Sequence, residues 1–309
     1  MNIAILGAGA MGSLFGGLLA EAGQDVILLD INEGHLNAIR NNGLGLCTDS
    51  GDRQVTRLTA MRPEQAQVSP DLLIVFTKTL HTEAALAGVR RLLSPDTLVL
   101  TLQNGLGNIE AVGRHVRQDR ILIGMTTWPA DLVGPGQVRS HGQGLVRIMP
   151  VEIQQQKAAT QVAKILSLAG LRCEVDPQAW TAIWEKVAFN AALNSLCAVT
   201  GCTVGQLNAV SDGLALARAV VAEVIATAQS AGINADAAHC MASVTDALAR
   251  HKAHKPSMLQ DVIAGRQTEI ESINGEVVAR AHRAGIAVPH TEMLLGLVRL
   301  IQARKAEDA

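Results

Sequence analysis

The spacing of hydrophobic positions changes once along the chain, near residue 176. Before this point, short apolar runs without polar alternation are separated by longer segments with helical spacing. Such runs are typical of parallel strands that helices cover on both faces. The predicted strands are Asn2–Leu6, Val26–Leu29, Leu72–Phe76, Leu98–Leu102 and Ile121–Met125. The predicted helices include Met11–Ala22, Glu33–Asn41, His81–Leu93 and Asn108–Val116. Their alternation predicts an α/β fold with a doubly wound sheet.

A different pattern occupies Val138–Met149, where two short apolar stretches flank the turn His141–Gly144. We expect two short strands here and a further strand near Arg172–Val175. We expect all three to form the edge of the same sheet.

After Asp176-Pro177 the apolar residues recur with a period of 3.6, and strand-like runs almost disappear. The predicted helices are Gln178–Val199, Asp212–Ala231, Ala235–Arg250, Thr268–Ala284 and Thr291–Ala303. Thr268–Glu271 has the form of a capping box, and Gly285 is a natural helix stop. The chain therefore divides into residues 1–176 and an all-helical C-terminal domain of residues 177–309. We expect the substrate to lie in the cleft between the two domains.

Composition narrows the possible partners of this chain. Its 309 residues include 26 basic and 28 acidic side chains, three Phe, three Trp and no Tyr. Without a basic stripe or an aromatic platform, nucleic acid is not an expected partner. The five cysteines are scattered without a C-x-x-C pair, which favours a reducing compartment and no metal site. No apolar run approaches the ~18 residues that span a bilayer, so we expect a soluble cytoplasmic protein.

The glycines of the segment Gly7–Gly12 have the spacing G-x-G-x-x-G, between the first predicted strand and the first helix. In this context the first glycine permits a tight turn, the second lets the backbone approach a pyrophosphate, and the third lets the helix pack closely on the strand. Unpaired amides at the helix start favour phosphate. Asp30 follows the second strand, eighteen residues after Gly12, where a carboxylate can bind ribose hydroxyls. Residues 1–176 are therefore predicted to bind a dinucleotide.

One polar stripe marks the first helix of the second domain. Lys186, Asn190 and Asn194 are spaced i, i+4, i+8, and their neighbours are almost all apolar. A buried ammonium with two carboxamides is costly unless it is paired or faces a cleft. We favour a functional stripe over the alternative that Lys186 is a solvated surface lysine.

Three further positions have two interpretations each. Asn104 ends a strand, where open α/β sheets bind ligands, but Asn followed by Gly is also a common turn. Lys78, just past another strand, is either a cofactor neighbour or a surface cation. Glu269 is either a reacting carboxylate or a first-turn acid that the helix dipole favours.

Taken together, these segments resemble the ketopantoate reductase (2-dehydropantoate 2-reductase) family over nearly the whole chain. The matching segments are Gly7–Gly12, Lys78, Gln103-Asn104-Gly105, the helix with Lys186, Asn190 and Asn194, Ser257–Asp261, and Glu269-Ile270 with Asn274-Gly275. The resemblance implies an N-terminal Rossmann domain followed by an all-helical domain. It also implies reduction of ketopantoate to pantoate, in pantothenate biosynthesis.

The resemblance also implies roles for individual residues. Lys186 matches the family's general acid, and Glu269 matches the carboxylate near the lysine and the substrate. Substrate contacts are expected from Asn104, Lys186, Asn190, Asn194 and Ser257. Cofactor contacts are expected from Gly7, Ala8, Gly9, Ala10, Met11, Gly12, Asp30, Lys78, Asn104, Ala130 and Glu269.

Two positions depart from the family pattern. Asp30-Ile31-Asn32 stands where NADPH-dependent relatives commonly carry an arginine, which favours NAD(H) over the family's usual NADP(H). Val204 stands where an asparagine often binds substrate. We therefore interpret the chain as a nicotinamide-dependent 2-oxo acid reductase that acts on ketopantoate. A homodimer is compatible with the sequence, and no membrane partner is expected. The alternatives are an NAD-dependent D-2-hydroxyacid dehydrogenase of the same family and a non-catalytic nicotinamide sensor.

Overall fold

The protein is described from a computed structural model that covers residues 1–250 and 252–307. Its chain forms two compact units, which we describe separately. Unit 1 comprises Met1–Gln103 and Asn108–Ala179, and unit 2 comprises Asn104–Gly107 and Trp180–Ala309. The short segment Asn104–Gly107 therefore belongs to the second unit although it lies within the N-terminal half of the sequence.

Unit 1 is built on an eight-stranded sheet in the order β12-β11-β8-β7-β6-β1-β2-β5. These strands are β1 (Asn2–Leu6), β2 (Asp25–Leu29), β5 (Thr59–Met61), β6 (Leu72–Val75), β7 (Leu98–Thr101), β8 (Ile121–Thr126), β11 (Val146–Pro150) and β12 (Cys173–Val175). All neighbours are parallel except β8 and β11, which are antiparallel. The five predicted strands of this sheet are confirmed within one residue at each end, and β1 lies between β2 and β6 as a doubly wound sheet requires.

A second sheet of four strands corrects one prediction. Its order is β4-β3-β10-β9, from β3 (Leu44–Thr48), β4 (Gly51–Val55), β9 (Asp131–Gly134) and β10 (Gln137–Ser140). We expected both strands of Val138–Met149 at the edge of the main sheet. That is correct for β11 and wrong for β10, which pairs in parallel with β3.

The second sheet covers helix α1 (Ala10–Glu21), which contacts both β2 and β10. Most of α1 is buried, and a Cβ on Gly17 would lie 2.9 Å from Leu46 of β3. A helix that is apolar around its whole surface needs cover on more than one side. The composition of α1 was therefore the sequence signal for this second layer.

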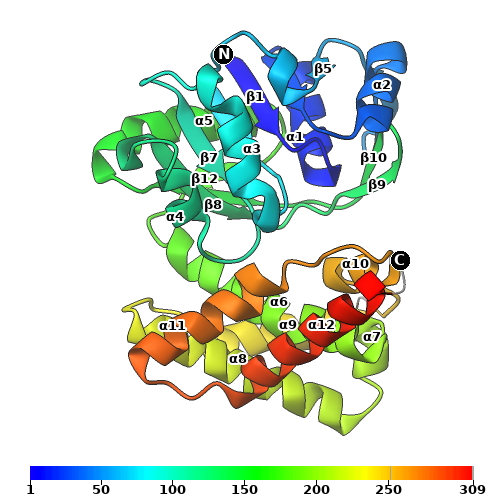
Figure 1. Ribbon diagram of the computed structural model, residues 1–309, viewed down its shortest axis with the longest axis vertical. Coiled ribbons are helices and arrows are strands. Elements are labelled where there is room, and N and C mark those ends of the chain that lie inside the picture. Colours follow the sequence, from blue (N-terminus) through cyan, green and yellow to red (C-terminus); the bar gives the residue numbers. More distant parts are fainter. Residues whose placement is uncertain (251, 308–309) are drawn as a thin grey trace. The chain divides into compact units, whose positions relative to one another are not determined.

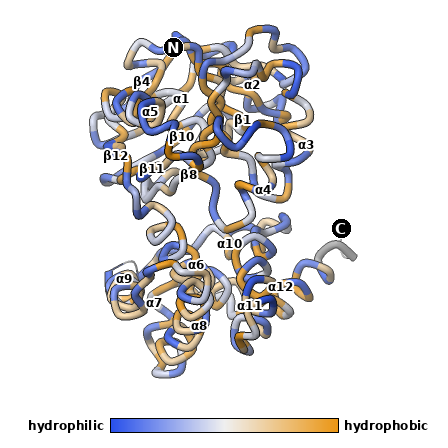
Figure 2. Tube along the Cα trace, turned by 90° about the vertical axis from the view of Figure 1, so that its left-hand side faces the viewer, coloured by the Kyte–Doolittle hydropathy of each residue, from blue (hydrophilic) through white to orange (hydrophobic). Residues whose placement is uncertain are grey.

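Four more helices complete unit 1: α2 (Glu33–Asn42), α3 (Thr82–Val89), α4 (Asn108–Gly113) and α5 (Gln156–Leu168). Both α3 and α4 are shorter than predicted, and 3-10 turns flank α3 at Thr79–His81 and Arg90–Leu92. Helix α3 lies in front of the strands in Figure 1. Hydrophobic colouring gathers on the central strands and blue on many of the loops (Figure 2), as expected for a sheet covered on both faces.

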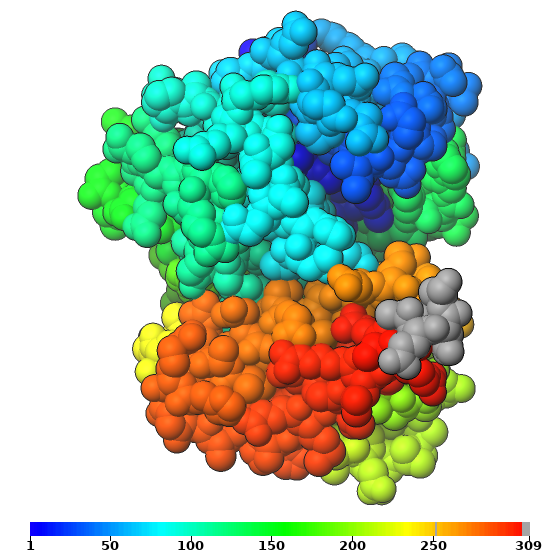
Figure 3. Space-filling model, viewed as in Figure 1, coloured from blue at the N-terminus to red at the C-terminus, as the bar shows by residue number. Residues whose placement is uncertain are grey.

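The described residues of unit 2 form helices joined by turns and loops, and they contain no strand. Its helices are α6 (Ala179–Thr200), α7 (Val204–Leu207), α8 (Ser211–Ser230), α9 (Ala237–Arg250), α10 (Ser257–Ile263), α11 (Glu276–Ala284) and α12 (Pro289–Glu307). The short helices α7 and α10 were not predicted. Helix α8 contacts α9, α11 and α12, and the last two form much of the face of this unit in Figure 3. No helix among the described residues is long and apolar enough to cross a membrane.

The predicted helix Thr268–Ala284 differs at its start. Residues Glu271–Gly275 form a π-helical turn that leads directly into α11. The Thr268 hydroxyl accepts a hydrogen bond from the Ile270 amide, as a cap would, but the Glu271 carboxylate accepts hydrogen bonds from Arg299. The reciprocal half of the predicted capping box is therefore replaced by an ion pair to α12.

A buried histidine supports the glycine turn of unit 1. His35 is 2% exposed, and its Nδ1 accepts a hydrogen bond from the Gly136 amide at 3.0 Å. The proton of the neutral ring therefore resides on Nε2, which lies 3.1 Å from the Ser13 hydroxyl. That hydroxyl in turn donates to the Ala8 carbonyl. A second proton on Nδ1 would face the Gly136 N–H, so this network requires neutral His35.

Stability is therefore expected to fall as the pH drops below about 6.5. Burial lowers the pKa of His35 from its usual 6.5, and the nearby Asp30 carboxylate only partly opposes this effect. The unfolded chain then binds the proton more tightly, so the stabilisation is complete above pH 6.5 and is lost as the pH falls toward the folded pKa. Between pH 7.5 and 5.5 the free energy of unfolding should decrease more for the wild type than for His35→Gln. Equal decreases for the two proteins would contradict this assignment.

Candidate functional site

The glycine turn between β1 and α1 has the geometry of a phosphate site. Gly7 has φ +97°, and a Cβ there would lie 2.6 Å from the Thr77 amide nitrogen. A Cβ on Gly12 would lie 1.9 Å from the Gly7 carbonyl oxygen, so these two positions accept only glycine. Gly9 is exposed with no atom within 4 Å of its missing side chain, and no side chain caps α1. The free amides of the α1 N-terminus are thus open to an anion, which fits a dinucleotide pyrophosphate.

Asp30 lies beside this turn, directly after β2. Its Oδ2 accepts a hydrogen bond from the Ala8 amide at 2.6 Å, and its Oδ1 accepts one from the Asn32 amide at 2.9 Å. The two bonds fix the orientation of a carboxylate that remains partly exposed. Because each carboxylate oxygen can accept more than one hydrogen bond, Asp30 can still receive a ribose diol.

Lys78 lies at the same end of the sheet. The Phe76 amide donates to the Leu6 carbonyl at 2.8 Å, which brings the segment after β6 next to the glycine turn. Lys78 precedes the 3-10 turn Thr79–His81 and is partly exposed. The Gln103 amide group ties this segment to β7, because it donates to the Thr77 carbonyl at 2.6 Å and to the Thr82 hydroxyl at 2.7 Å. The predicted cofactor residues Gly7–Gly12, Asp30 and Lys78 are thus close together.

Ala130 lies in the connection between β8 and β9, and it packs partly buried against the core of unit 1. Its predicted role is a backbone contact to the cofactor. No hydrogen bond joins it to the other predicted residues in the described part of the chain.

In unit 2, helix α6 carries the predicted polar stripe. Asn190 and Asn194 are 9% and 6% exposed, and neither carboxamide makes a hydrogen bond to another described residue. Lys186, on the same face, is only partly exposed. Burial lowers the pKa of its ammonium to about 8, although the negative charge of Glu269 opposes this shift. Both observations favour the functional stripe over a solvated surface lysine.

Glu269 connects this stripe to the segment Asn104–Gly107. Its carboxylate accepts a hydrogen bond from the Asn104 side-chain amide at 3.3 Å. The segment is held in place by the Leu106 amide, which donates to the Ser272 carbonyl of the π-turn at 2.8 Å. Gly105 has φ +84°, and a Cβ there would lie 2.4 Å from the same carbonyl oxygen. Lys186, Glu269 and Asn104, which are far apart in sequence, therefore form one cluster.

Ser257 is separate from this cluster in the contacts of the structure. It is the first residue of α10, is exposed, and makes no side-chain hydrogen bond to a described residue. Sequence reasoning also missed three residues that hold the predicted ones: His35 and Ser13 in unit 1 and Ser195 in unit 2. It singled out Asn274 but gave it no role. Ser13 and Ser195 are polar residues in largely apolar segments, which was the available signal, whereas His35 and Asn274 lie among other polar residues.

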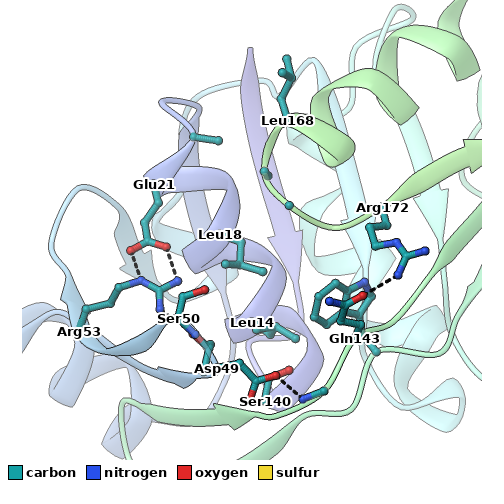
Figure 4. A pocket seen from close by; sticks show the side chains of 16 residues that line it. Leu14, Leu18, Glu21, Asp49, Ser50, Arg53, Ser140, Gln143, Leu168 and Arg172 are labelled. Atoms are coloured by element: carbon teal, nitrogen blue, oxygen red, sulfur yellow. Dashed lines mark hydrogen bonds and ion pairs between the residues drawn. The ribbon is translucent and has the colours of Figure 1, made fainter.

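A cavity of about 540 Å³ lies on unit 1 (Figure 4), and no residue of the glycine turn Gly7–Gly12 lines it. It is lined by the C-terminal half of α1, the β3–β4 turn and the residues before β12, with the Glu21–Arg53 ion pair at one side and the Arg172–Gln143 hydrogen bond at the other. None of its sixteen lining residues is a predicted site residue. Among the described residues, no group of His, Cys, Asp and Glu side chains is arranged to hold a metal ion.

Comparisons with known proteins show the family of this chain. The model of the ketopantoate reductase PanE/ApbA family matches residues 3–152, and the model of its C-terminal domain matches residues 178–302. A 2-dehydropantoate 2-reductase from Streptococcus pyogenes serotype M6 is 35% identical over 304 residues, which cover 98% of each chain. The chain belongs to the ketopantoate reductase family. The family predicted from the sequence is thus confirmed.

Two solved structures have folds closely similar to that of this chain. D-mandelate dehydrogenase in a ternary complex with NADH and anilino(oxo)acetate has a TM-score of 0.95 and 31% identity, and the match covers 99% of this chain and 100% of that one. A PanE/ApbA family ketopantoate reductase from Ralstonia eutropha JMP134 has a TM-score of 0.90 and 32% identity, with the same coverage. The solved structures similar to this chain thus include one named as a D-mandelate dehydrogenase and one named as a ketopantoate reductase.

Proposed function

We propose that this member of the ketopantoate reductase family reduces the C2 ketone of ketopantoate with a nicotinamide cofactor. The observation that supports it most is the cluster of Lys186, Glu269 and Asn104, in a chain whose curated relatives are 2-dehydropantoate 2-reductases. Burial lowers the pKa of an ammonium and a neighbouring carboxylate raises it, so such a pair can act as a proton donor near neutral pH.

The residues of unit 1 fit the cofactor. The α1 N-terminus and the open backbone at Gly9 would receive the pyrophosphate, and Asp30 would accept hydrogen bonds from the adenosine ribose. A reduced nicotinamide, when bound, supplies a hydride. The residues of the chain do the rest: they bind the acid, orient its carbonyl and move one proton.

Lys186 would supply that proton. With a pKa of about 8, its ammonium is mostly protonated at neutral pH and still releases a proton far more readily than an ordinary lysine. As the ketone is reduced, Nζ donates its proton to the forming alkoxide, and the positive charge stabilises this oxygen before transfer. Glu269 holds the ammonium charged and orients Asn104.

Asn190 and Asn194 would bind the polar groups of the substrate. Both carboxamides are largely buried without a hydrogen bond to a described residue, and buried polar groups normally have a partner. Carboxamides can donate to a carboxylate and both donate to and accept from a hydroxyl. Ketopantoate carries both of these groups. Ser257 at the start of α10 would add a further hydroxyl.

A second candidate is an NAD-dependent D-2-hydroxyacid dehydrogenase. Val204 is 2% exposed at the start of α7, and its side chain cannot form the hydrogen bond that an asparagine would supply there. The similar structure of D-mandelate dehydrogenase also contains NADH, which agrees with Asp30. A non-catalytic sensor, by contrast, would not need an ammonium of lowered pKa beside two unpaired carboxamides.

The substrate is tested by comparing ketopantoate with 2-oxoisovalerate, which lacks the hydroxymethyl group. A site that binds a hydroxyl leaves polar groups unpaired when it is absent, so kcat/KM for ketopantoate should be at least about tenfold higher. Phenylglyoxylate, the aromatic 2-oxo acid that corresponds to mandelate, tests the second candidate in the same assay. A higher kcat/KM for either comparison acid would replace ketopantoate as the proposed substrate. No turnover of any 2-oxo acid would favour the sensor.

A further inference from the structure

The π-helical turn Glu271–Gly275 is the point in unit 2 where three segments of the proposed site meet. Its Ser272 carbonyl binds the Leu106 amide, two residues after Asn104. The Ser272 hydroxyl and the Ile273 amide both donate to the Glu269 carbonyl, at 3.1 Å each. The main chain on both sides of the Asn104–Glu269 hydrogen bond is therefore fixed by this turn.

Asn274 connects the same turn to helix α6. The Ser195 hydroxyl donates to Asn274 Oδ1 at 2.9 Å, and Asn274 Nδ2 donates to the Ala191 carbonyl at 3.4 Å. Both Ser195 and Asn274 are completely buried. Each α6 partner directly follows one asparagine of the polar stripe, because Ala191 follows Asn190 and Ser195 follows Asn194.

The π-helical geometry explains why Asn274 reaches α6. A π-turn holds one more residue than an α-helical turn and rotates the side chains that follow, and such turns are frequent at functional sites. Glu271, at its start, points to Arg299 of α12, whereas Asn274 is buried against α6. The turn thus presents Asn274 to one helix while its backbone holds Glu269 and Leu106.

We propose that Asn274 is a positioning residue, which with Ser195 fixes α6 relative to the π-turn and so sets the distance from Lys186 to Glu269 and Asn104. Asn274 is not itself a proton donor, because both of its polar groups are already engaged with α6. This inference rests on the proposed function, since it assigns the proposed proton donor a structural partner. Because reaction rates are sensitive to displacements of about 1 Å, a loose α6 should impair turnover without abolishing folding.

The test uses Ser195→Ala, Asn274→Ala and the double variant in the full-length protein. Alanine is a good helix former, so Ser195→Ala should fold even if Asn274→Ala does not. Thr227→Val is the matched control: Thr227 is 1% exposed in α8, and its hydroxyl bonds the Glu223 carbonyl of its own helix. This control removes a buried hydroxyl of the same unit away from the π-turn.

Ser195→Ala and Asn274→Ala should each lower kcat for ketopantoate by about tenfold, with a smaller change in KM. The double variant should resemble Asn274→Ala, because the two residues share one hydrogen bond. Thr227→Val should lose some thermal stability but keep its kcat. The inference is overturned if the folded Ser195→Ala variant has the kcat of the control.

A second readout does not require turnover. The pKa of Lys186 can be followed by NMR of ¹³C-labelled lysine side chains, with the signal assigned from its loss in Lys186→Met. Weaker attraction by Glu269 should lower this pKa below its value in the control, and an unchanged pKa would contradict the inference. If the wild type reduces no 2-oxo acid, the proposed function fails while this titration still decides the role of Asn274.

Discussion

Replacing Lys186 by alanine is expected to lower kcat for ketopantoate reduction by roughly 10²- to 10⁴-fold, the usual contribution of a positioned general acid. The proton must be on Nζ before the reaction, and burial lowers the pKa of this group to about 8. In the wild type, kcat/KM for reduction should therefore decrease above about pH 8. Lys157→Ala is the control, because Lys157 lies exposed on α5 of unit 1. Near-native turnover of Lys186→Ala would refute the proposed mechanism.

The buried ammonium of Lys186 should lower the free energy of unfolding at neutral pH. Because the folded pKa of Lys186 lies below its usual 10.5, the unfolded chain holds the proton more tightly. The cost is present below about pH 8 and disappears as the pH rises toward 10.5. Lys186→Met, which keeps the length of the side chain without the charge, should consequently be at least as stable as the wild type at pH 7. A large loss of stability in this variant would show that the ammonium is structural.

Asp30→Asn is expected to lower the preference for NADH over NADPH by about 10- to 100-fold. A hydrogen bond from the ribose to a charged acceptor contributes about 1.5–3 kcal/mol, and every 1.4 kcal/mol corresponds to a factor of ten. Asparagine retains one acceptor oxygen, which can still bind the Ala8 amide of the glycine turn, and it gives up the hydrogen bond from the Asn32 amide. It also removes the charge that repels a 2′-phosphate.

The ratio of kcat/KM for the two cofactors is measured at low salt, where such charge effects are largest. Asp25→Asn serves as the control, because Asp25 is an exposed carboxylate at the opposite end of the same strand. A wild type that prefers NADPH, or an unchanged ratio in Asp30→Asn, would contradict the assignment of Asp30 to the ribose.

The strands of the main sheet were predictable because each is buried on both faces. Leu72–Val75, for example, is fully buried and has no polar residue, and such a short apolar run is typical of a strand covered on both faces. The partner of β10 was not predictable in this way. A buried residue such as Val138 would fit either sheet. Only the pairing with β3, which is distant in sequence, decides which sheet β10 joins.

The polar stripe of α6 was predictable because helical spacing alone places Lys186, Asn190 and Asn194 on one face. Glu269 remained ambiguous, since a first-turn acid and a partner of Lys186 occupy the same sequence position. The Ser195–Asn274 pair joins residues 79 positions apart, and the pattern of an α-helix does not distinguish a π-turn within it. Local spacing thus identified the polar side chains of α6, whereas the residues that hold them in place could be found only from the tertiary fold.

Because Asn104–Gly107 belongs to unit 2, the two halves of this chain cannot be exchanged freely with those of a relative. A chimera that joins residues 1–179 of one relative to the helical half of another takes the loop from one parent and the π-turn from the other. Gly105 has no room for a side chain against the Ser272 carbonyl, so even a small shift of that turn in the new parent would displace Asn104. Asn104–Gly107 and the π-turn Glu271–Gly275 should therefore come from the same parent in any chimera made to exchange substrate specificity.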